Sequence, residues 1–189
     1  SDEQIGFDTQ NYIFMIGLGW ENPDTGNWEY EDFTVNKVNL EEESKIITDM
    51  WDLIDNLMIK YQIKELPNFY HWSHAEPTCY TKALRRHNFN FRSINFADLL
   101  KVFKSEPIVI KGNLKFGLKG VAKAMHKNNL IETIWDSDNP CSNGLTAMVL
   151  AWKTYSKNKL QDIHKNPVIQ DIIKYNVIDC KVLWEIINY

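Results

Sequence analysis

Residues 166–189, NPVIQDIIKYNVIDCKVLWEIINY, decide the fold expected for the whole chain. Asn166 can cap a helix, and Pro167 suits the first helical position. Apolar residues then recur at helical spacing: Val168, Ile169, Ile172, Ile173, Leu183, Ile186 and Ile187. The pattern predicts a long C-terminal helix with one apolar face.

Tyr175 and Asp179 lie four residues apart in this helix, so we expect them on one face, one turn apart. Asp179 stands among Val177, Ile178 and Val182. Burying a carboxylate among apolar neighbours is costly unless a positive group meets it. The surroundings therefore predict either a divalent metal or a buried Lys or Arg. The alternative is a solvated aspartate beside a tyrosine at the core edge, because many helices carry this pair.

The composition predicts a single globular domain over residues 1–189, with a polar segment at 1–11. Hydrophobic residues at 44% argue against disorder, and the net charge of -4 provides no overall basic field for nucleic acid. The three cysteines show no C-x-x-C spacing, which predicts reduced thiols. The sequence shows no signal peptide and no apolar run that could span a bilayer. We therefore expect an intracellular protein, cytoplasmic or nuclear, without a membrane partner; a viral source is compatible with the abundance of Asn, Ile and Lys.

Strand and helix patterns alternate along the chain. The apolar run Tyr12–Trp20 and the alternating run Trp28–Val35 flank a turn and predict an antiparallel hairpin. Asn39 then caps a helix that extends to about Lys60, with Glu42 completing a capping box. Shorter elements follow: a strand at 68–72, a helix from Pro77 to about His87, a strand within 90–100, and helices at 118–126 and 144–155. The predicted fold class is α/β, a mixed sheet flanked by helices.

Two further carboxylates are candidate site residues. Glu76 follows a predicted strand and precedes a helix, where its side chain can project into a cleft over the sheet. Asp98 lies in an apolar segment after another predicted strand. Each has a structural alternative: the helix dipole favours a glutamate at the position of Glu76, and Asp98 can be a cap or turn residue. A zinc site built from His71, His74, Cys79 and His87 is disfavoured, because their spacing fits no usual zinc pattern.

Basic residues are concentrated in two places. Arg85 and Arg86 end the helix that follows Glu76, and Lys115 and Lys119 belong to the glycine-containing segment 112–125. This segment does not match the P-loop pattern. The functional interpretation of these residues is contact with a phosphate backbone, and the alternative is a solvated helix face.

Together these segments resemble the RNase H-like, DEDD-type nuclease domains described as predicted RecB-family nucleases. Members tend to show, in order, a strand with Asp-x-Glu, a strand like Y-I-F-M-I-G, then Y-H-Y-x-x-x-E-P, D-L-L, S-L-K, D-G-x-x-A and Y-N-x-x-D. Six segments match in that order: Tyr12–Leu18, Tyr70–Pro77, Asp98–Leu100, Gly117–Lys119, Asn143–Ala147 and Tyr175–Asp179. The resemblance thus spans Tyr12 to Tyr189.

The resemblance implies an RNase H-like fold and a metal-dependent nuclease that hydrolyses DNA or RNA phosphodiesters as a 3′ to 5′ exonuclease. Two Mg²⁺ or Mn²⁺ ions would stabilise the attacking and leaving oxygens. By position, Glu76 and Asp179 look like catalytic metal ligands, and Tyr175 looks like the residue that orients the attacking water. Asp98 matches a further family position and is a third candidate ligand. Lys119 looks like a residue that contacts the nucleic-acid backbone or supports the site.

The first family motif, Asp-x-Glu, has no match in this chain. Asp2 and Glu3 are adjacent, so they would face opposite sides of a strand. The segment Asp8-Thr9-Gln10 has only the first acid and leads into the next strand without room for a turn.

Likewise, only two of the three antiparallel strands that open the RNase H-like fold are predicted. Two explanations are open. The chain lacks a segment upstream of Ser1 and belongs to a longer protein with further domains, or it is a pseudo-nuclease. The latter would be a non-catalytic module that binds nucleic acid or a protein partner.

Overall fold

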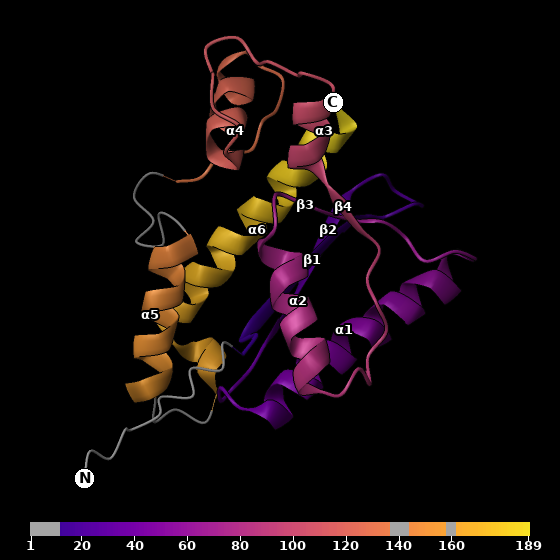
Figure 1. Ribbon diagram of the computed structural model, residues 1–189, viewed down its shortest axis with the longest axis vertical. Helices are drawn as coiled ribbons and strands as arrows, with labels where there is room; N and C mark the ends of the chain where they lie inside the picture. The colour runs from indigo at the N-terminus through magenta and orange to yellow at the C-terminus, as the bar shows by residue number, and fades with distance from the viewer. Residues whose placement is uncertain (1–11, 137–143, 158–161) are drawn as a thin grey trace.

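The computed structural model describes residues 12–136, 144–157 and 162–189, and its elements follow the predicted order (Figure 1). The strands are β1 (Met15–Glu21), β2 (Trp28–Thr34), β3 (Phe69–His71) and β4 (Phe96–Asp98). The helices are α1 (Leu40–Lys60), α2 (Ala75–Arg86), α3 (Leu99–Ser105), α4 (Leu118–Lys127), α5 (Gly144–Lys157) and α6 (Pro167–Asn188), with a 3-10 turn at Ile163–Lys165. The predicted α/β class is confirmed. No helix within the described ranges has the length and apolar character needed to cross a bilayer.

The strands pair with both polarities. β1 and β2 form the predicted antiparallel hairpin, in which Met15 lies opposite Thr34. β3 and β4 are parallel, and His71 lies opposite Asp98. In the described part of the chain these pairs form two separate sheets, and no strand precedes β1. The candidate first-motif residues fall in the segment 1–11, which lies outside the described residues.

Alternate residues of β1 contact helices on opposite faces. Ile16 and Leu18 belong to the hydrophobic core of α1 and α2. Met15 packs with α5 and α6, and Gly17 lies against α6 at Asn176. Because successive side chains of a strand point to opposite faces, β1 separates an α1–α2 layer from α6. Figure 1 shows α3 and α4 near the C-terminal end of α6, and α5 beside its N-terminal half.

The start of α1 shows one confirmed and one wrong detail. The Asn39 side chain accepts a hydrogen bond from the backbone N–H of Glu42 at 2.8 Å, as a cap should. The second contact of the predicted capping box, in which the Glu42 side chain accepts from the backbone N–H of Asn39, is wrong. The Glu42 carboxylate instead accepts from the backbone N–H of Asn36 at 3.1 Å, and thereby ties the preceding loop to the helix.

The start of α2 also differs from the prediction. The helix begins at Ala75, two residues before the predicted start at Pro77. Proline is tolerated there because the first helical N–H groups have no partner within the helix. Glu76 therefore lies inside the first turn of α2 rather than in the preceding junction.

The C-terminal helix forms as predicted. The Asn166 side chain accepts a hydrogen bond from Val168 N at 3.0 Å, and Pro167 is the first helical residue. The buried positions of α6 are Ile169, Ile172, Tyr175, Val182 and Ile186. Ile187 is the exception to the predicted apolar stripe, since it is 38% exposed.

Candidate active site

Helix α6 is fixed on the sheet at the turn that carries Tyr175 and Asp179. A Cβ at Gly17 of β1 would lie 1.7 Å from Asn176 Oδ1, so only glycine permits this approach. Tyr30 of β2 donates its hydroxyl hydrogen to Asn176 Oδ1 at 2.7 Å. The hairpin and α6 are therefore in direct contact between the two candidate catalytic residues.

Asp179 is not a solvated surface carboxylate. Its pKa is raised from 3.8 to about 7, chiefly by burial and in smaller part by the negative charge of Glu76. Trp135 Nε1 donates a hydrogen bond to Asp179 Oδ1 at 2.7 Å. This bond and the charge of Lys119 both favour the ionised form and lower the pKa. The positive neighbour that the sequence required is thus a lysine, with an indole N–H beside it.

Lys119, at the start of α4, lies over two aromatic rings. Its Nζ is 4.7 Å from the ring centroid of Tyr175 and 5.3 Å from that of Trp135. Such contacts are favourable because the face of an aromatic ring is negative. Desolvation lowers the pKa of Lys119, and Asp179 opposes that shift. Lys119, predicted to contact or support the site, therefore lies beside both Tyr175 and Asp179.

The segment that carries Trp135 is anchored to α6. The carboxylate of Glu185 accepts hydrogen bonds from the backbone N–H groups of Glu132 and Thr133 at 2.8 and 2.9 Å, and a third from the Thr133 hydroxyl. These bonds to the charged form lower the pKa of Glu185. Sequence reasoning missed both Trp135 and Glu185. The available signal was a tryptophan in an otherwise polar, irregular stretch.

Glu76 lies in the first turn of α2, with 54% of its side chain exposed. Desolvation nonetheless raises its pKa, and repulsion from Asp98 adds to this, whereas His71 and His74 oppose it. Its Oε2 is 3.7 Å from Nδ1 of the buried His71 at the end of β3. The charge of Glu76 also raises the pKa of Asp179, so the acids of α2 and α6 interact electrostatically.

Asp98 has a structural task. Its Oδ1 accepts hydrogen bonds from Leu100 N at 3.0 Å and from Ser73 N at 2.9 Å. The first caps α3, and the second holds the turn between β3 and α2. The cap interpretation of Asp98 is therefore what its contacts show.

The donor set suits a hard divalent cation, because carboxylates and water are the preferred ligands of Mg²⁺ and Mn²⁺. Within the described ranges, however, no three His, Cys, Asp or Glu side chains are placed to hold one metal ion together. Glu76 and Asp179 stay candidate ligands predicted from the sequence. Asp2, Glu3 and Asp8, the remaining acids considered from the sequence, lie outside the described residues.

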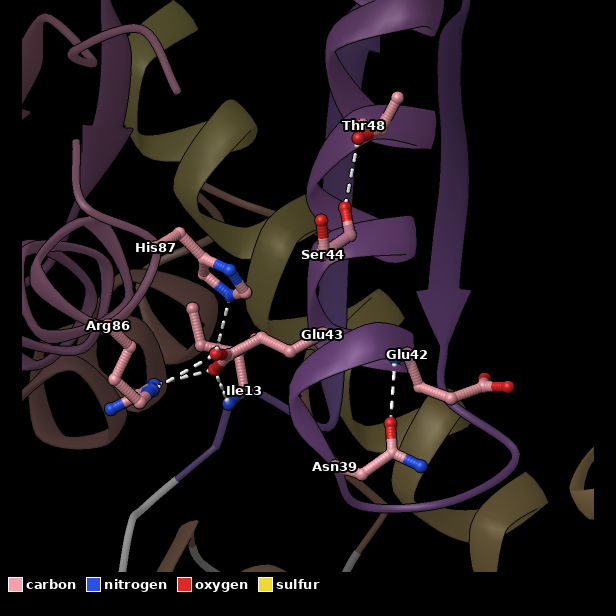
Figure 2. A network of polar contacts seen from close by, with 8 residues as sticks. All are labelled: Ile13, Asn39, Glu42, Glu43, Ser44, Thr48, Arg86 and His87. Atoms are coloured by element: carbon pink, nitrogen blue, oxygen red, sulfur yellow. Dashed lines mark hydrogen bonds and ion pairs between the residues drawn. The ribbon is translucent and has the colours of Figure 1, made fainter. Parts of the chain in front are cut away.

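The predicted phosphate-contacting residues differ in setting. Arg85 and Lys115 are exposed. Arg86 faces the fully buried Glu43 of α1, with Nη2 2.6 Å from Oε1 and Nε 3.0 Å from Oε2 (Figure 2). His87 Nε2 and the backbone N–H of Ile13 also lie at this carboxylate, at 3.0 and 2.6 Å. Arg86 thereby ties the end of α2 to α1 and to the chain entering β1.

The α/β architecture, with the β1–β2 hairpin between α1 and α6, is consistent with the RNase H-like fold expected from the sequence. The comparison with protein families agrees: the RNase H superfamily matches residues 3–189. The chain belongs to the RNase H superfamily. No curated protein and no solved structure matches it significantly. Membership points to a nuclease-like or nucleic-acid-binding function and to use of divalent metals.

Proposed function

We propose that this protein is an intracellular, metal-dependent nuclease domain that hydrolyses DNA or RNA phosphodiesters, as a 3′ to 5′ exonuclease. The observation that carries the proposal is the RNase H superfamily match over residues 3–189, and the electrostatic interaction of two candidate ligands, Glu76 and Asp179, supports it. The two acids are more than a hundred residues apart in sequence, and both have pKa values raised by burial. Perturbed acids that gather in one place are typical of functional sites.

In this proposal Glu76 and Asp179 hold the divalent metal, Mg²⁺ or Mn²⁺. When two such ions are bound, they supply charge stabilisation to the attacking and leaving oxygens of the phosphodiester. The residues of the chain orient these groups. Trp135 fixes one oxygen of Asp179, which leaves the other available, and Tyr175 orients the attacking water. Asp98 Oδ1 serves two backbone amides, so only Oδ2 of this third candidate ligand is left to contact the metal.

Lys119 is the residue we propose to meet the substrate phosphate nearest the site. Its ammonium group is close enough to Asp179 to lower that residue's pKa. Arg85 and Lys115 are exposed and can extend the contact along a phosphate backbone. We leave Arg86 out of this set, because its guanidinium pairs with the buried Glu43.

The test combines metal binding with strand cleavage. Mn²⁺ binding is measured by calorimetry on the wild type, on Asp179→Asn and on the matched control Asp171→Asn. Asp171 lies two turns before Asp179 on α6 and forms an ion pair with Lys174. The same proteins are assayed on DNA and RNA strands labelled at the 3′ or the 5′ end. We expect binding and cleavage in the wild type and Asp171→Asn, and neither in Asp179→Asn. Loss of label from the 3′ end first would establish the polarity.

A non-catalytic RNase H-like module is the second candidate function. Two observations favour it: the described residues hold no three-ligand metal group, and a pKa of about 7 leaves Asp179 partly protonated near neutral pH without a metal. Such a module would bind nucleic acid or a protein partner without cutting. Nucleic-acid binding without Mn²⁺ binding or cleavage would support the module and contradict the nuclease.

A further inference from the structure

His71 leaves a polar atom buried without a partner. The residue is 5% exposed, and its Nδ1 makes no hydrogen bond. An unsatisfied buried polar group is destabilising, so each instance calls for an explanation. The other such atoms in the described residues are two indole nitrogens and a tyrosine hydroxyl, at Trp20, Trp28 and Tyr61. Of these four atoms, Nδ1 of His71 is the one that can offer a nitrogen lone pair to a metal.

The local backbone brings Glu76 back over His71. His71 ends β3 and its ring packs edge-on against Phe96, 5.3 Å between centroids. The chain then turns at Ser73, whose φ of 76° is in the left-handed region and whose N–H is held by Asp98. A non-glycine residue at such a φ is strained and persists only where its surroundings impose it. This turn places Glu76 Oε2 3.7 Å from His71 Nδ1.

Two neighbouring groups that could pair with Nδ1 already use one polar atom elsewhere. Oδ1 of Asp98, the register partner of His71, accepts from two backbone amides. His74 is exposed, and its own Nδ1 is 3.0 Å from Ser73 Oγ. Glu76 remains as the group that faces Nδ1, and 54% of its side chain is exposed, so the carboxylate end of the pair is open to solvent.

We propose that His71 Nδ1 and Glu76 Oε2 together bind one divalent cation, and that the imidazole makes the site prefer Mn²⁺ to Mg²⁺. The inference rests on the proposed function and gives the metal preference of one of its two ions, with Glu76 shared between them, since no three His, Cys, Asp or Glu side chains of the described residues are placed to hold a single ion. With metal–ligand bonds of about 2.1 Å, a separation of 3.7 Å corresponds to an angle of about 120° at the metal. Mg²⁺ demands near-octahedral angles and oxygen ligands, whereas imidazole suits transition metals. Water and substrate phosphate complete the coordination.

The test is pulsed electron paramagnetic resonance of Mn²⁺ bound to the full chain, which detects a nitrogen attached directly to the metal. We expect a ¹⁴N coupling in the wild type that becomes a ¹⁵N coupling in ¹⁵N-labelled protein. His71→Asn places an oxygen near the position of Nδ1 and should abolish the coupling, and His74→Asn is the matched control that should retain it. Calorimetry should show tighter binding of Mn²⁺ than of Mg²⁺ by about tenfold or more, with the preference lost in His71→Asn.

Each outcome decides the inference. Mn²⁺ that binds without a nitrogen coupling, or a coupling that survives in His71→Asn, overturns the role of His71 and leaves the metal-dependent nuclease standing. Absence of Mn²⁺ binding in the wild type overturns both. The labelling experiment uses wild-type protein, so absence of a nitrogen coupling overturns the inference even if His71→Asn fails to fold, and His71→Gln is then the second variant that assigns an observed coupling. A nitrogen coupling in a protein that cleaves no DNA or RNA supports the metal site while the nuclease proposal fails.

Discussion

Replacing Trp135 by Phe tests whether the indole N–H prepares Asp179 for metal binding. The substitution removes the 2.7 Å hydrogen bond to Asp179 Oδ1 and keeps an aromatic face under Lys119, since phenylalanine also attracts cations. The bond favours the ionised carboxylate, so its loss raises the pKa of Asp179 further. A hydrogen bond to a charged group contributes about 1.5–3 kcal/mol, and 1.4 kcal/mol is a factor of ten, so the Mn²⁺ dissociation constant should rise about 10- to 150-fold.

The assay is Mn²⁺ calorimetry near neutral pH, with urea unfolding of each protein to verify the fold. Trp152→Phe is the matched control, because Trp152 of α5 is 71% exposed and should leave metal affinity unchanged. A metal-free measurement accompanies it. The indole ¹H–¹⁵N resonance that disappears in Trp135→Phe should shift in Asp179→Asn, since that variant replaces the charged acceptor.

An unchanged Mn²⁺ dissociation constant in folded Trp135→Phe protein would refute the reasoning about affinity. An indole resonance that does not respond to Asp179→Asn would show that the hydrogen bond does not form in solution. A parallel loss of affinity in Trp152→Phe would indicate a general effect of removing a tryptophan rather than the loss of this contact.

Three further changes test the scaffold around the site. Gly17→Ala should destabilise the fold by about 1–3 kcal/mol in urea unfolding, because its Cβ would overlap Asn176, whereas Gly117→Ala meets no neighbour within 4 Å and should be nearly neutral. Glu43→Gln should lower the free energy of unfolding by about 3–5 kcal/mol, because it leaves the largely buried Arg86 without its charge partner. The control is Glu41→Gln, since Glu41 is exposed. Equal stability of the two variants would contradict the role of the pair. Asp179→Asn should alter the pH dependence of stability. The folded wild type keeps a proton on Asp179 that the unfolded chain loses above pH 3.8. The free energy of unfolding of the wild type, compared with that of the variant, is therefore highest below pH 3.8, and it falls by up to about 4 kcal/mol as the pH rises through about 7. Unfolding curves at pH 4 and pH 8 measure the effect, and a stability difference that does not change with pH would contradict the raised pKa.

Local signals in the sequence determined most of the secondary structure. Asn39 and Asn166 are capping residues, and the side chain of each accepts the backbone hydrogen bond that its position predicted. Alternation of side chains predicted the β1–β2 hairpin, and helical spacing predicted that Tyr175 and Asp179 share one helix. These predictions succeeded because they depend on interactions between residues close together in the chain.

The tertiary structure alone decided how these residues are used. The indole of Trp135 reaches Asp179 across 44 positions of sequence, and Arg86 pairs with Glu43 across 43. Such contacts follow from the packing of α2 on α1 and of the segment that carries Trp135 on α6, and no periodicity in the sequence reports them. Gly17 shows the same limit, since it is an ordinary strand glycine until α6 packs against it. Sequence thus named the acids Glu76 and Asp179, whereas only the packed chain determined their neighbours, their protonation and the room around them.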